Sequence, residues 1–283
     1  MQTTIRNAWF EVTADTRGAE LTSVRYKGKE RLWQNEDGSW QGHAPVLFPV
    51  CGVCAMRVGG WEYPCPKHGF AREREFLLAE KTADTLRFRL TNDAVTETVY
   101  PFAFVFEVAY TLSEACLTTT YTVRNPAESS LYFSCGGHDS FTLDREVKNY
   151  ELLFEKEEVF RHHLVDERTG KLTGESVPLG AGQVLDLATP YLDGGGSVCL
   201  DRLRSRSVLL QDKETGCRVA RVTFHGTEKL VLWHPAGAKM LCIEPWQTLP
   251  DKAGDDSEFS EKDGVLCVPP HGERQITRVL QYD

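Results

Sequence analysis

The chain has 283 residues, of which 41% are hydrophobic and 26% charged, and its formal net charge is −9 at pH 7. This composition is ordinary for a globular protein with a sizeable core, while the negative charge argues against nucleic acid or an anionic membrane surface as a partner. No stretch approaches the ~20 apolar residues of a membrane span, and residues 1–7 lack the apolar segment of a signal peptide. We therefore expect a cytoplasmic protein.

Paired strands are predicted near the start of the chain, at 10–12 and 19–26, on either side of a turn. Further segments that alternate apolar and polar residues follow in chain order at 85–90, 102–110, 117–123, 207–210 and 217–224. Each is short, rich in β-branched or aromatic residues, and bounded by turn-forming residues, which is typical of strands. Because no regular helical spacing lies between them, the sequence predicts an all-β fold of antiparallel sheets packed face to face.

Two segments are expected to depart from this pattern. A short helix is predicted near 156–163, and 251–264 is predicted to be a surface loop because it is acidic, contains glycine and is poor in apolar residues. No linker, internal repeat or low-complexity tract divides the chain. A single domain over residues 1–283 is therefore the preferred interpretation, although length alone allows ~2 domains.

The nine cysteines are an odd number, and several lie within apolar or alternating runs. Buried free thiols in a reducing compartment explain this better than a disulfide framework. A competing pattern, Cys-x2-Cys-x10-Cys-x2-His, has a spacing that a structural zinc site can use, and it comprises Cys51, Cys54, Cys65 and His68. The apolar run 47–50 leads directly into the first pair, so we favour small apolar fillers and expect no metal.

The strongest candidates for chemistry are an imidazole and a carboxylate that lie far apart in the sequence. His138 follows Gly136-Gly137, where the backbone can turn sharply and approach a ligand closely. A histidine so placed is expected to titrate near neutrality, as a general acid should. The alternative is a histidine that only caps a turn.

Glu244 lies at the end of the apolar segment 240–243 and precedes Pro245 and Trp246. We expect the proline to end the strand and the indole to desolvate the carboxylate, which raises its pKa and strengthens it as a base. The indole also offers an apolar wall suited to a sugar ring. The alternative is a strand-end glutamate that points into water.

Two further residues, His68 and Arg72, are candidates for hydrogen bonds to ligand hydroxyl groups, since the guanidinium fork suits vicinal oxygens. Their alternatives are an ordinary turn residue and a surface cation. The chain contains no glycine-rich phosphate cradle and no nucleophile elbow, so a nucleotide cofactor is unsupported.

Taken together and in order, these motifs resemble the aldose 1-epimerase (galactose mutarotase) family, and most closely its LacX-like bacterial branch. The stretches that carry the resemblance are GAEL (18–21), RLWQ (31–34), APVLFP (44–49), HGFAR (68–72), GGH (136–138) followed by Phe141, and EPW (244–246) followed by Asp251. The resemblance implies a large antiparallel β-sandwich, the galactose mutarotase-like supersandwich, and a cofactor-independent isomerase acting on a small sugar.

The resemblance also implies roles. Glu244 would take the proton of the anomeric hydroxyl, His138 would protonate the ring oxygen, and His68 and Arg72 would hold hydroxyl groups. Ring opening, rotation of the aldehyde and closure from the other face would then interconvert the α and β anomers of a free hexose such as galactose or glucose.

This chain departs from the family pattern at two positions. The LacX-like branch usually has an arginine where Val53 stands and an aspartate where Gly196 stands, and we expect Arg57 or Asp193 to compensate. Two alternative functions stay open. One is a sugar-binding or sensing module without turnover, and the other is a hexose-6-phosphate 1-epimerase with Arg72 and Arg74 at its rim.

Overall fold

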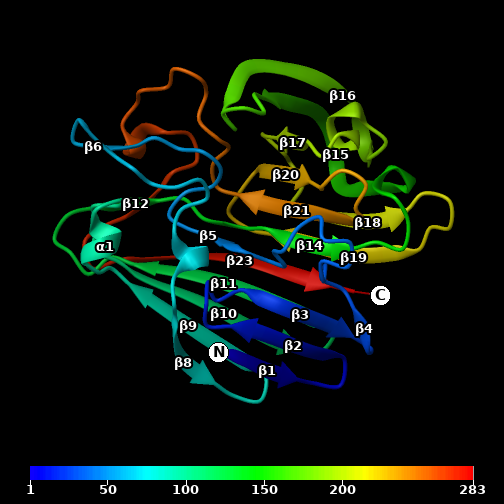
Figure 1. The fold of residues 1–283 in the computed structure, drawn as a ribbon, viewed down its shortest axis with the longest axis horizontal. Coiled ribbons are helices and arrows are strands. Elements are labelled where there is room, and N and C mark those ends of the chain that lie inside the picture. The colour runs from blue at the N-terminus through cyan, green and yellow to red at the C-terminus, as the bar shows by residue number, and fades with distance from the viewer. Residues whose placement is uncertain (283) are drawn as a thin grey trace.

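The computed structural model describes residues 1–282, and its regular secondary structure is almost entirely strand (Figure 1). The first four strands form a sheet of their own in the order β1-β2-β3-β4. Their bounds are β1 (Gln2–Arg6), β2 (Phe10–Asp15), β3 (Leu21–Tyr26) and β4 (Lys29–Glu30). This confirms the paired strands predicted at the start of the chain.

Most of the remaining strands belong to one 15-stranded sheet, in the order β5-β13-β21-β20-β17-β15-β18-β19-β23-β11-β10-β9-β8, with β14 also on β21 and β16 on β15. The bounds are β5 (Val46–Leu47), β8 (Leu77–Lys81), β9 (Thr85–Thr91), β10 (Val105–Ser113), β11 (Cys116–Arg124), β13 (Gly136–Gly137), β14 (Asp139–Thr142), β15 (Tyr150–Val165), β16 (Leu172–Asp186), β17 (Ser197–Leu200), β18 (Ser207–Asp212), β19 (Arg218–Phe224), β20 (Lys229–Trp233), β21 (Met240–Trp246) and β23 (Glu273–Gln281). Two small antiparallel pairs, β6 (Met56–Val58) with β7 (Trp61–Tyr63) and β12 (Leu131–Phe133) with β22 (Leu266–Val268), complete the strands of residues 1–282. The predicted all-β antiparallel class is confirmed.

Helix is confined to short pieces in the described chain. These are α1 (Ala94–Glu97), α2 (Pro190–Asp193) and the 3-10 turns η1 (Ala71–Glu73), η2 (Val147–Asn149) and η3 (Phe259–Glu261). None of these helices is long and apolar enough to span a bilayer. The helix predicted near 156–163 is wrong, because this segment lies within β15. Glu158, Phe160 and His162 are buried at a spacing of two, which is the period of a strand.

The prediction of a surface loop at 251–264 is only partly correct. The segment has no strand, but Asp251 and Phe259 are buried and the Lys262 side chain is only 5% exposed. A carboxylate oxygen of Asp251 lies 2.9 Å from Lys262 Nζ and accepts a hydrogen bond from the Ala55 backbone N–H at 2.6 Å. The charges that suggested solvent exposure instead anchor the loop to the rest of the protein.

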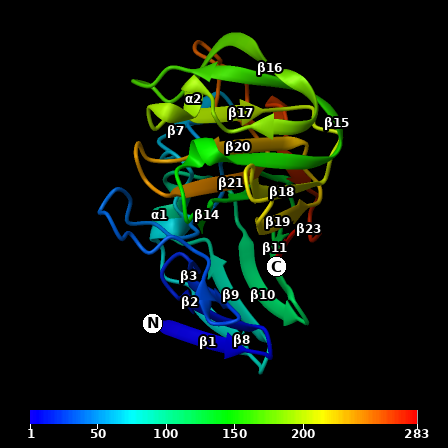
Figure 2. The same ribbon diagram turned by 90° about the vertical axis from the view of Figure 1, so that its right-hand side faces the viewer.

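The hydrophobic core lies between the two sheets. The sheet β1–β4 covers the β9–β11 part of the large sheet (Figure 2), and buried residues of both contribute to one apolar cluster. Phe48 stacks on Phe106 at a centroid distance of 4.3 Å. The hydroxyl of Tyr110 donates to the Ala19 carbonyl oxygen at 2.6 Å, which joins the sheets by a buried polar contact. Each such aromatic side chain contributes about 1.5–3 kcal/mol through burial.

A buried ion pair crosses the core beside the Gly136-Gly137 motif. Arg278 Nε lies 2.9 Å from Asp139 Oδ2, and the side chains are 5% and 0% exposed. The same guanidinium donates to the Tyr121 hydroxyl at 3.1 Å. A Cβ at Gly137 would lie only 1.4 Å from Arg278 Nη1. Glycine at this position makes room for the arginine, a role that the sequence did not indicate.

We predict that Gly137→Ala destabilises the protein by about 3–5 kcal/mol, the usual cost of separating a buried ion pair, because the added methyl group displaces Arg278 from Asp139. Urea denaturation measures the change. Gly194→Ala is the matched control, since a Cβ there meets no atom within 4 Å. Equal stability of the two variants would show that Arg278 can move without cost.

Candidate functional site

The strand register places the predicted imidazole opposite the predicted carboxylate. His138 lies between β13 and β14, and both strands pair with β21 in the same register, through Gly136 with Trp246 and Asp139 with Ile243. Directly opposed residues of antiparallel strands point to the same face. His138 and Glu244 therefore meet on one side of the sheet, although they are far apart in the sequence.

These two side chains line a pocket of about 360 Å³. Its floor is the face of the sheet, and its remaining walls come from loops of the chain. The lining residues are Trp40, Gly52, Lys67, His68, Arg72, His138, Val165, Gly170, Ser197, Cys199, Val231, Trp233, Glu244, Trp246 and Pro250. A larger hollow of about 560 Å³ lies near Trp9 and Arg221, but its lining contains neither a histidine nor a carboxylate.

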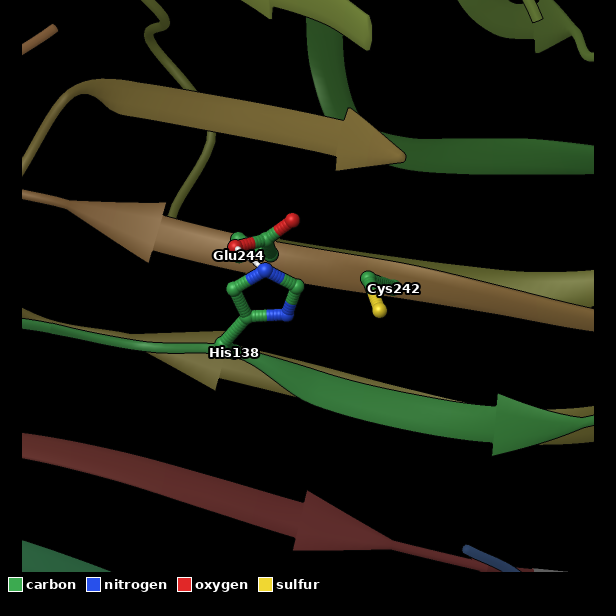
Figure 3. A group of neighbouring side chains, drawn as sticks. All are labelled: His138, Cys242 and Glu244. Carbon is green, nitrogen blue, oxygen red and sulfur yellow. Dashed lines mark ion pairs between the residues drawn. The ribbon is translucent and has the colours of Figure 1, made fainter. Parts of the chain in front are cut away.

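His138 and Glu244 are in direct contact at the floor of this pocket. Nε2 of the imidazole lies 3.3 Å from Oε2 of the carboxyl group (Figure 3), and the side chains are 11% and 1% exposed. The His138 ring stacks on Trp40 at 5.1 Å and meets the edge of Trp233 at 5.8 Å. The aromatic rings hold the imidazole in place and exclude water from it.

Burial changes the titration of both groups. It raises the pKa of Glu244 well above its ordinary 4.5, the charge of Asp139 adds to this rise, and Lys67 opposes it. Burial also lowers the pKa of His138 from 6.5 to about 3, and the cations Arg72 and Lys67 contribute to that decrease. The rise expected for Glu244 is confirmed, whereas the near-neutral value expected for His138 is wrong.

Burial disfavours the charged form of each group, since it raises the pKa of Glu244 and lowers the pKa of His138. Nε2 of His138 and Oε2 of Glu244 are only 3.3 Å apart. A carboxyl group and an imidazole at this separation can serve one small ligand as a base and an acid.

The loop that carries His68 forms the wall next to this pair. His68 is buried, and its Nδ1 accepts a hydrogen bond from the Gly52 backbone N–H at 3.1 Å. Burial lowers the pKa of His68, with further contributions from His138 and two nearby cations. The imidazole is therefore neutral with its proton on Nε2, which makes that atom a hydrogen-bond donor.

Two cations line the pocket. Arg72 lies in η1, and its Nη2 donates to the Lys67 carbonyl oxygen at 3.3 Å. Lys67 is exposed and forms no ion pair within residues 1–282. Both are available to an oxygen-rich ligand, and both influence the titration of His138.

Trp246 forms an apolar wall of the pocket, as its place beside Glu244 suggested. It is 4% exposed, and its ring meets His68 edge to face at a centroid distance of 5.3 Å. The expectation that Pro245 ends the strand is wrong, since β21 continues to Trp246 and Pro245 pairs with Leu230. This continuation keeps Glu244 and Trp246 on the same face of the sheet.

Arg57 and Asp193, which were expected to replace charged residues that this chain lacks relative to the family pattern, lie outside this pocket. Arg57 is in β6 and pairs with Glu62 at 3.3 Å, and Asp193 is at the end of α2; neither is a lining residue. A Cβ at Gly196 would lie 2.4 Å from a backbone carbonyl oxygen, so a side chain does not fit there without a local shift.

The alternative zinc set is not assembled within residues 1–282. Cys51, Cys54 and Cys65 are free thiols, and the Gly52 N–H occupies Nδ1 of His68. Burial raises the pKa of Cys51 to about 12, so the thiol is protonated at neutral pH. One other group of potential metal ligands does occur in the described chain, and it consists of His138, Cys242 and Glu244.

The sequence interpretation missed Lys67 and the two tryptophans that contact His138. Lys67 directly precedes the HGFAR motif, so extending this motif by one residue towards the N-terminus includes it. Trp233 on β20 pairs with Cys242 on β21, which is two residues from Glu244. Strand alternation therefore indicates that Trp233 lies on the same face of the sheet as Glu244. Trp40 lies in a loop, where no periodic pattern predicts its position.

Comparison with known proteins identifies the family. The chain matches the aldose 1-epimerase family over residues 1–281. It is 30% identical over 309 residues to the chromosomal protein LacX of Lactococcus lactis subsp. lactis, with 99% of this chain and 95% of that protein covered. The chain therefore belongs to the aldose 1-epimerase family.

Solved structures agree with this assignment. A galactose mutarotase-like protein from Lactobacillus casei ATCC 334 has a TM-score of 0.92 and 26% identity, with 100% of both chains covered. A galactose mutarotase related enzyme from Lactobacillus acidophilus has a TM-score of 0.88 and 25% identity, covering 100% of this chain and 97% of that one. The large antiparallel β-sandwich is thus of the galactose mutarotase type.

The raised pKa of Glu244 predicts how its replacement changes stability with pH. The unfolded carboxyl group loses its proton near 4.5, while the folded one retains it to higher pH, so this group's contribution to stability is fully present below 4.5 and is lost as pH rises. Because glutamine does not titrate, the Glu244→Gln variant does not lose this stability as the pH rises. We expect its stability relative to wild type, measured by urea denaturation, to increase from pH 4.5 to pH 8.

The exposed Glu157→Gln exchange is the control, and its difference from wild type should stay nearly constant over this range. A stability difference for Glu244→Gln that does not change with pH would mean that Glu244 titrates normally in the folded protein.

Proposed function

We propose that this chain is an aldose 1-epimerase that interconverts the α and β anomers of a free hexose such as galactose or glucose. The observation that carries the proposal is the buried His138–Glu244 pair on the floor of a pocket walled by indoles. The pocket volume of about 360 Å³ lies within the usual range for small-molecule sites, roughly 300–1,000 Å³.

Anomer exchange needs one proton to leave the anomeric hydroxyl and one to reach the ring oxygen, and both atoms are bonded to the same carbon. In the ion-pair form, the carboxylate of Glu244 accepts the first proton and the imidazolium of His138 donates the second. The carbon–ring oxygen bond then breaks, and the result is an open-chain aldehyde beside a neutral pair. Burial disfavours the charged form of both groups, so it favours the neutral pair that is left once the ring has opened.

Closure reverses these transfers after the aldehyde has rotated. The protonated carboxyl group returns its proton to the aldehyde oxygen, and the neutral imidazole takes the proton of the attacking hydroxyl group. The pair ends with the proton count with which it began. Catalysis therefore requires no exchange with bulk water, which suits a pair whose side chains are 11% and 1% exposed.

The remaining pocket residues are assigned to positioning. His68 presents its Nε2–H to a sugar hydroxyl, because its other nitrogen is already occupied by the Gly52 N–H. Arg72 supplies a guanidinium for neighbouring oxygens. The indole of Trp246 offers an apolar surface to the carbon-bound hydrogens of the sugar. Together these contacts hold the rest of the molecule while the anomeric carbon turns.

We predict that Glu244→Gln and His138→Asn each slow mutarotation by ~10²–10⁴, the usual contribution of a positioned acid or base, and leave sugar affinity within about tenfold. Polarimetry on freshly dissolved α-galactose and α-glucose measures the rate, and calorimetric titration measures binding. The double variant should be little slower than either single one, because the two residues act in one event.

His163→Asn is the matched control, since His163 lies on the same face of the sheet but pairs with Asp201 at 2.9 Å outside this pocket. It should retain the wild-type rate. If the wild type binds sugar without accelerating mutarotation above buffer, the chain is a sugar-binding module. If the wild type is fast and both site variants stay fast, the residue assignment is wrong.

A second candidate, a hexose-6-phosphate 1-epimerase, is favoured by one observation. Lys67 and Arg72 both line the pocket, and Lys67 forms no ion pair within residues 1–282. A phosphate group bound in the pocket would neutralise the positive charges of both side chains. Arg74, which the sequence also suggested for this role, forms an ion pair with Asp93 and is not a lining residue.

If the substrate is phosphorylated, Lys67→Met should reduce kcat/KM for galactose 6-phosphate by about 10–100-fold, the equivalent of a charge-assisted hydrogen bond, and leave kcat/KM for galactose nearly unchanged. Arg74→Met is the control and should affect neither substrate. Equal effects of Lys67→Met on both sugars, or none, would leave free hexose as the substrate.

A further inference from the structure

Three potential metal ligands lie together: His138 and Glu244 line the pocket, and Cys242 is fully buried beside them. A ring nitrogen of His138, Sγ of Cys242 and a carboxylate oxygen of Glu244 all lie within 4.8 Å of one another. Cys242 and Glu244 are two residues apart on β21, so their side chains share one face, and His138 approaches from the neighbouring strand (Figure 3). The sequence interpretation assigned no role to Cys242.

Two of these donors lack hydrogen-bond partners. Oε2 of Glu244 and Nδ1 of His138 are buried and form no hydrogen bond within residues 1–282, although Oε2 lies 3.3 Å from Nε2 of His138. Buried polar atoms are normally satisfied, so these atoms indicate that a ligand is needed to complete them. The sugar proposed above is one such ligand, but its proposed contacts do not include the thiol of Cys242.

We propose that His138, Cys242 and Glu244 bind a thiophilic divalent cation, zinc above all, and that the bound cation excludes the sugar. Imidazole nitrogen, thiolate sulfur and carboxylate oxygen are the three ligand types of zinc, at bond lengths of roughly 2.0–2.3 Å. In a tetrahedral site these lengths separate the ligand atoms by roughly 3.3–3.8 Å. The present separations of up to 4.8 Å therefore need only a small contraction by side-chain rotation.

The charges of the site suit such an ion. A thiolate and a carboxylate neutralise two positive charges, and the imidazole is already neutral, so the complex carries no net charge in a buried place. Binding releases protons from the thiol and the carboxyl group, so affinity increases with pH. Lys67 and Arg72 line the same pocket and repel the cation, which makes binding reversible rather than structural.

A cation bound to His138 and Glu244 would occupy the two groups that the proposed reaction needs. Zinc and sugar then compete for His138 and Glu244. Metal binding itself stands without the proposed activity, whereas inhibition by the metal rests on it. The two parts are measured separately, so a failure of one is distinguished from a failure of the other.

Cobalt(II) chloride is the probe for binding, because a cobalt–thiolate bond gives a charge-transfer absorption in the near ultraviolet. The background carries serine at the exposed cysteines Cys217 and Cys267. We expect one cobalt per chain with the thiolate absorption, displacement by zinc, and loss of the absorption in Cys242→Ser. Zinc affinity should fall by at least roughly 10–100-fold, since even changes outside the ligand set cost this much at zinc sites.

Cys199→Ser is the matched control. Cys199 is a buried free thiol that lines the same pocket, yet it is not part of the ligand group. It should keep the absorption. Absence of the absorption in the parent protein, its persistence in Cys242→Ser, or its loss in Cys199→Ser would each overturn the proposal. Cys242→Ala replaces Cys242→Ser if circular dichroism shows that the serine variant does not fold.

The inhibitory part is tested by polarimetry in the same background. Zinc should raise the apparent KM for galactose without changing kcat, and Cys242→Ser should need at least roughly tenfold more zinc for the same effect. Cobalt binding that added galactose does not weaken would show that metal and sugar occupy different places.

Discussion

The arrangement of the pocket depends on the buried ion pair between Asp139 and Arg278. The carboxylate is on β14, next to His138, and the guanidinium comes from β23 near the end of the chain. Adjacent residues of a strand point to opposite faces, so Asp139 points into the core while His138 points into the pocket. A buried pair contributes little net stability over apolar packing, but breaking it is costly. It therefore acts here mainly by fixing where one strand lies against another.

The same pair influences the chemistry of the site. The charge of Asp139 adds to the effect of burial in raising the pKa of Glu244. Arg278, which does not line the pocket, opposes the effect of burial on the pKa of Asp139 itself. A structural carboxylate on one face of the sheet thus raises the pKa of the candidate base on the other face.

Short sequence patterns identified the centre of the site but not its surroundings. His138, Glu244, His68, Arg72 and Trp246 all line one pocket, because strand alternation and the HGFAR loop can be recognised locally. The pKa of His138 could not be predicted, since its decrease depends on burial by aromatic residues from distant segments. The helix expected at 156–163 is wrong because the segment belongs to the long strand β15, in which Glu158, Phe160 and His162 are buried at the period of a strand.

The placement of Arg57 and Asp193 shows the limit of reasoning by position in a chain. Arg57 lies in β6 and Asp193 at the end of α2, and neither lines the pocket, although each is only three or four residues from a position that the resemblance singled out. Lys67, adjacent to His68, is the cation that lines the pocket together with Arg72. Strand alternation places Cys242 on the same face of the sheet as Glu244. Burial and unpartnered donor atoms, which mark His138 and Glu244 as a candidate acid–base pair, are also features that a zinc ion would use once a thiol lies within reach.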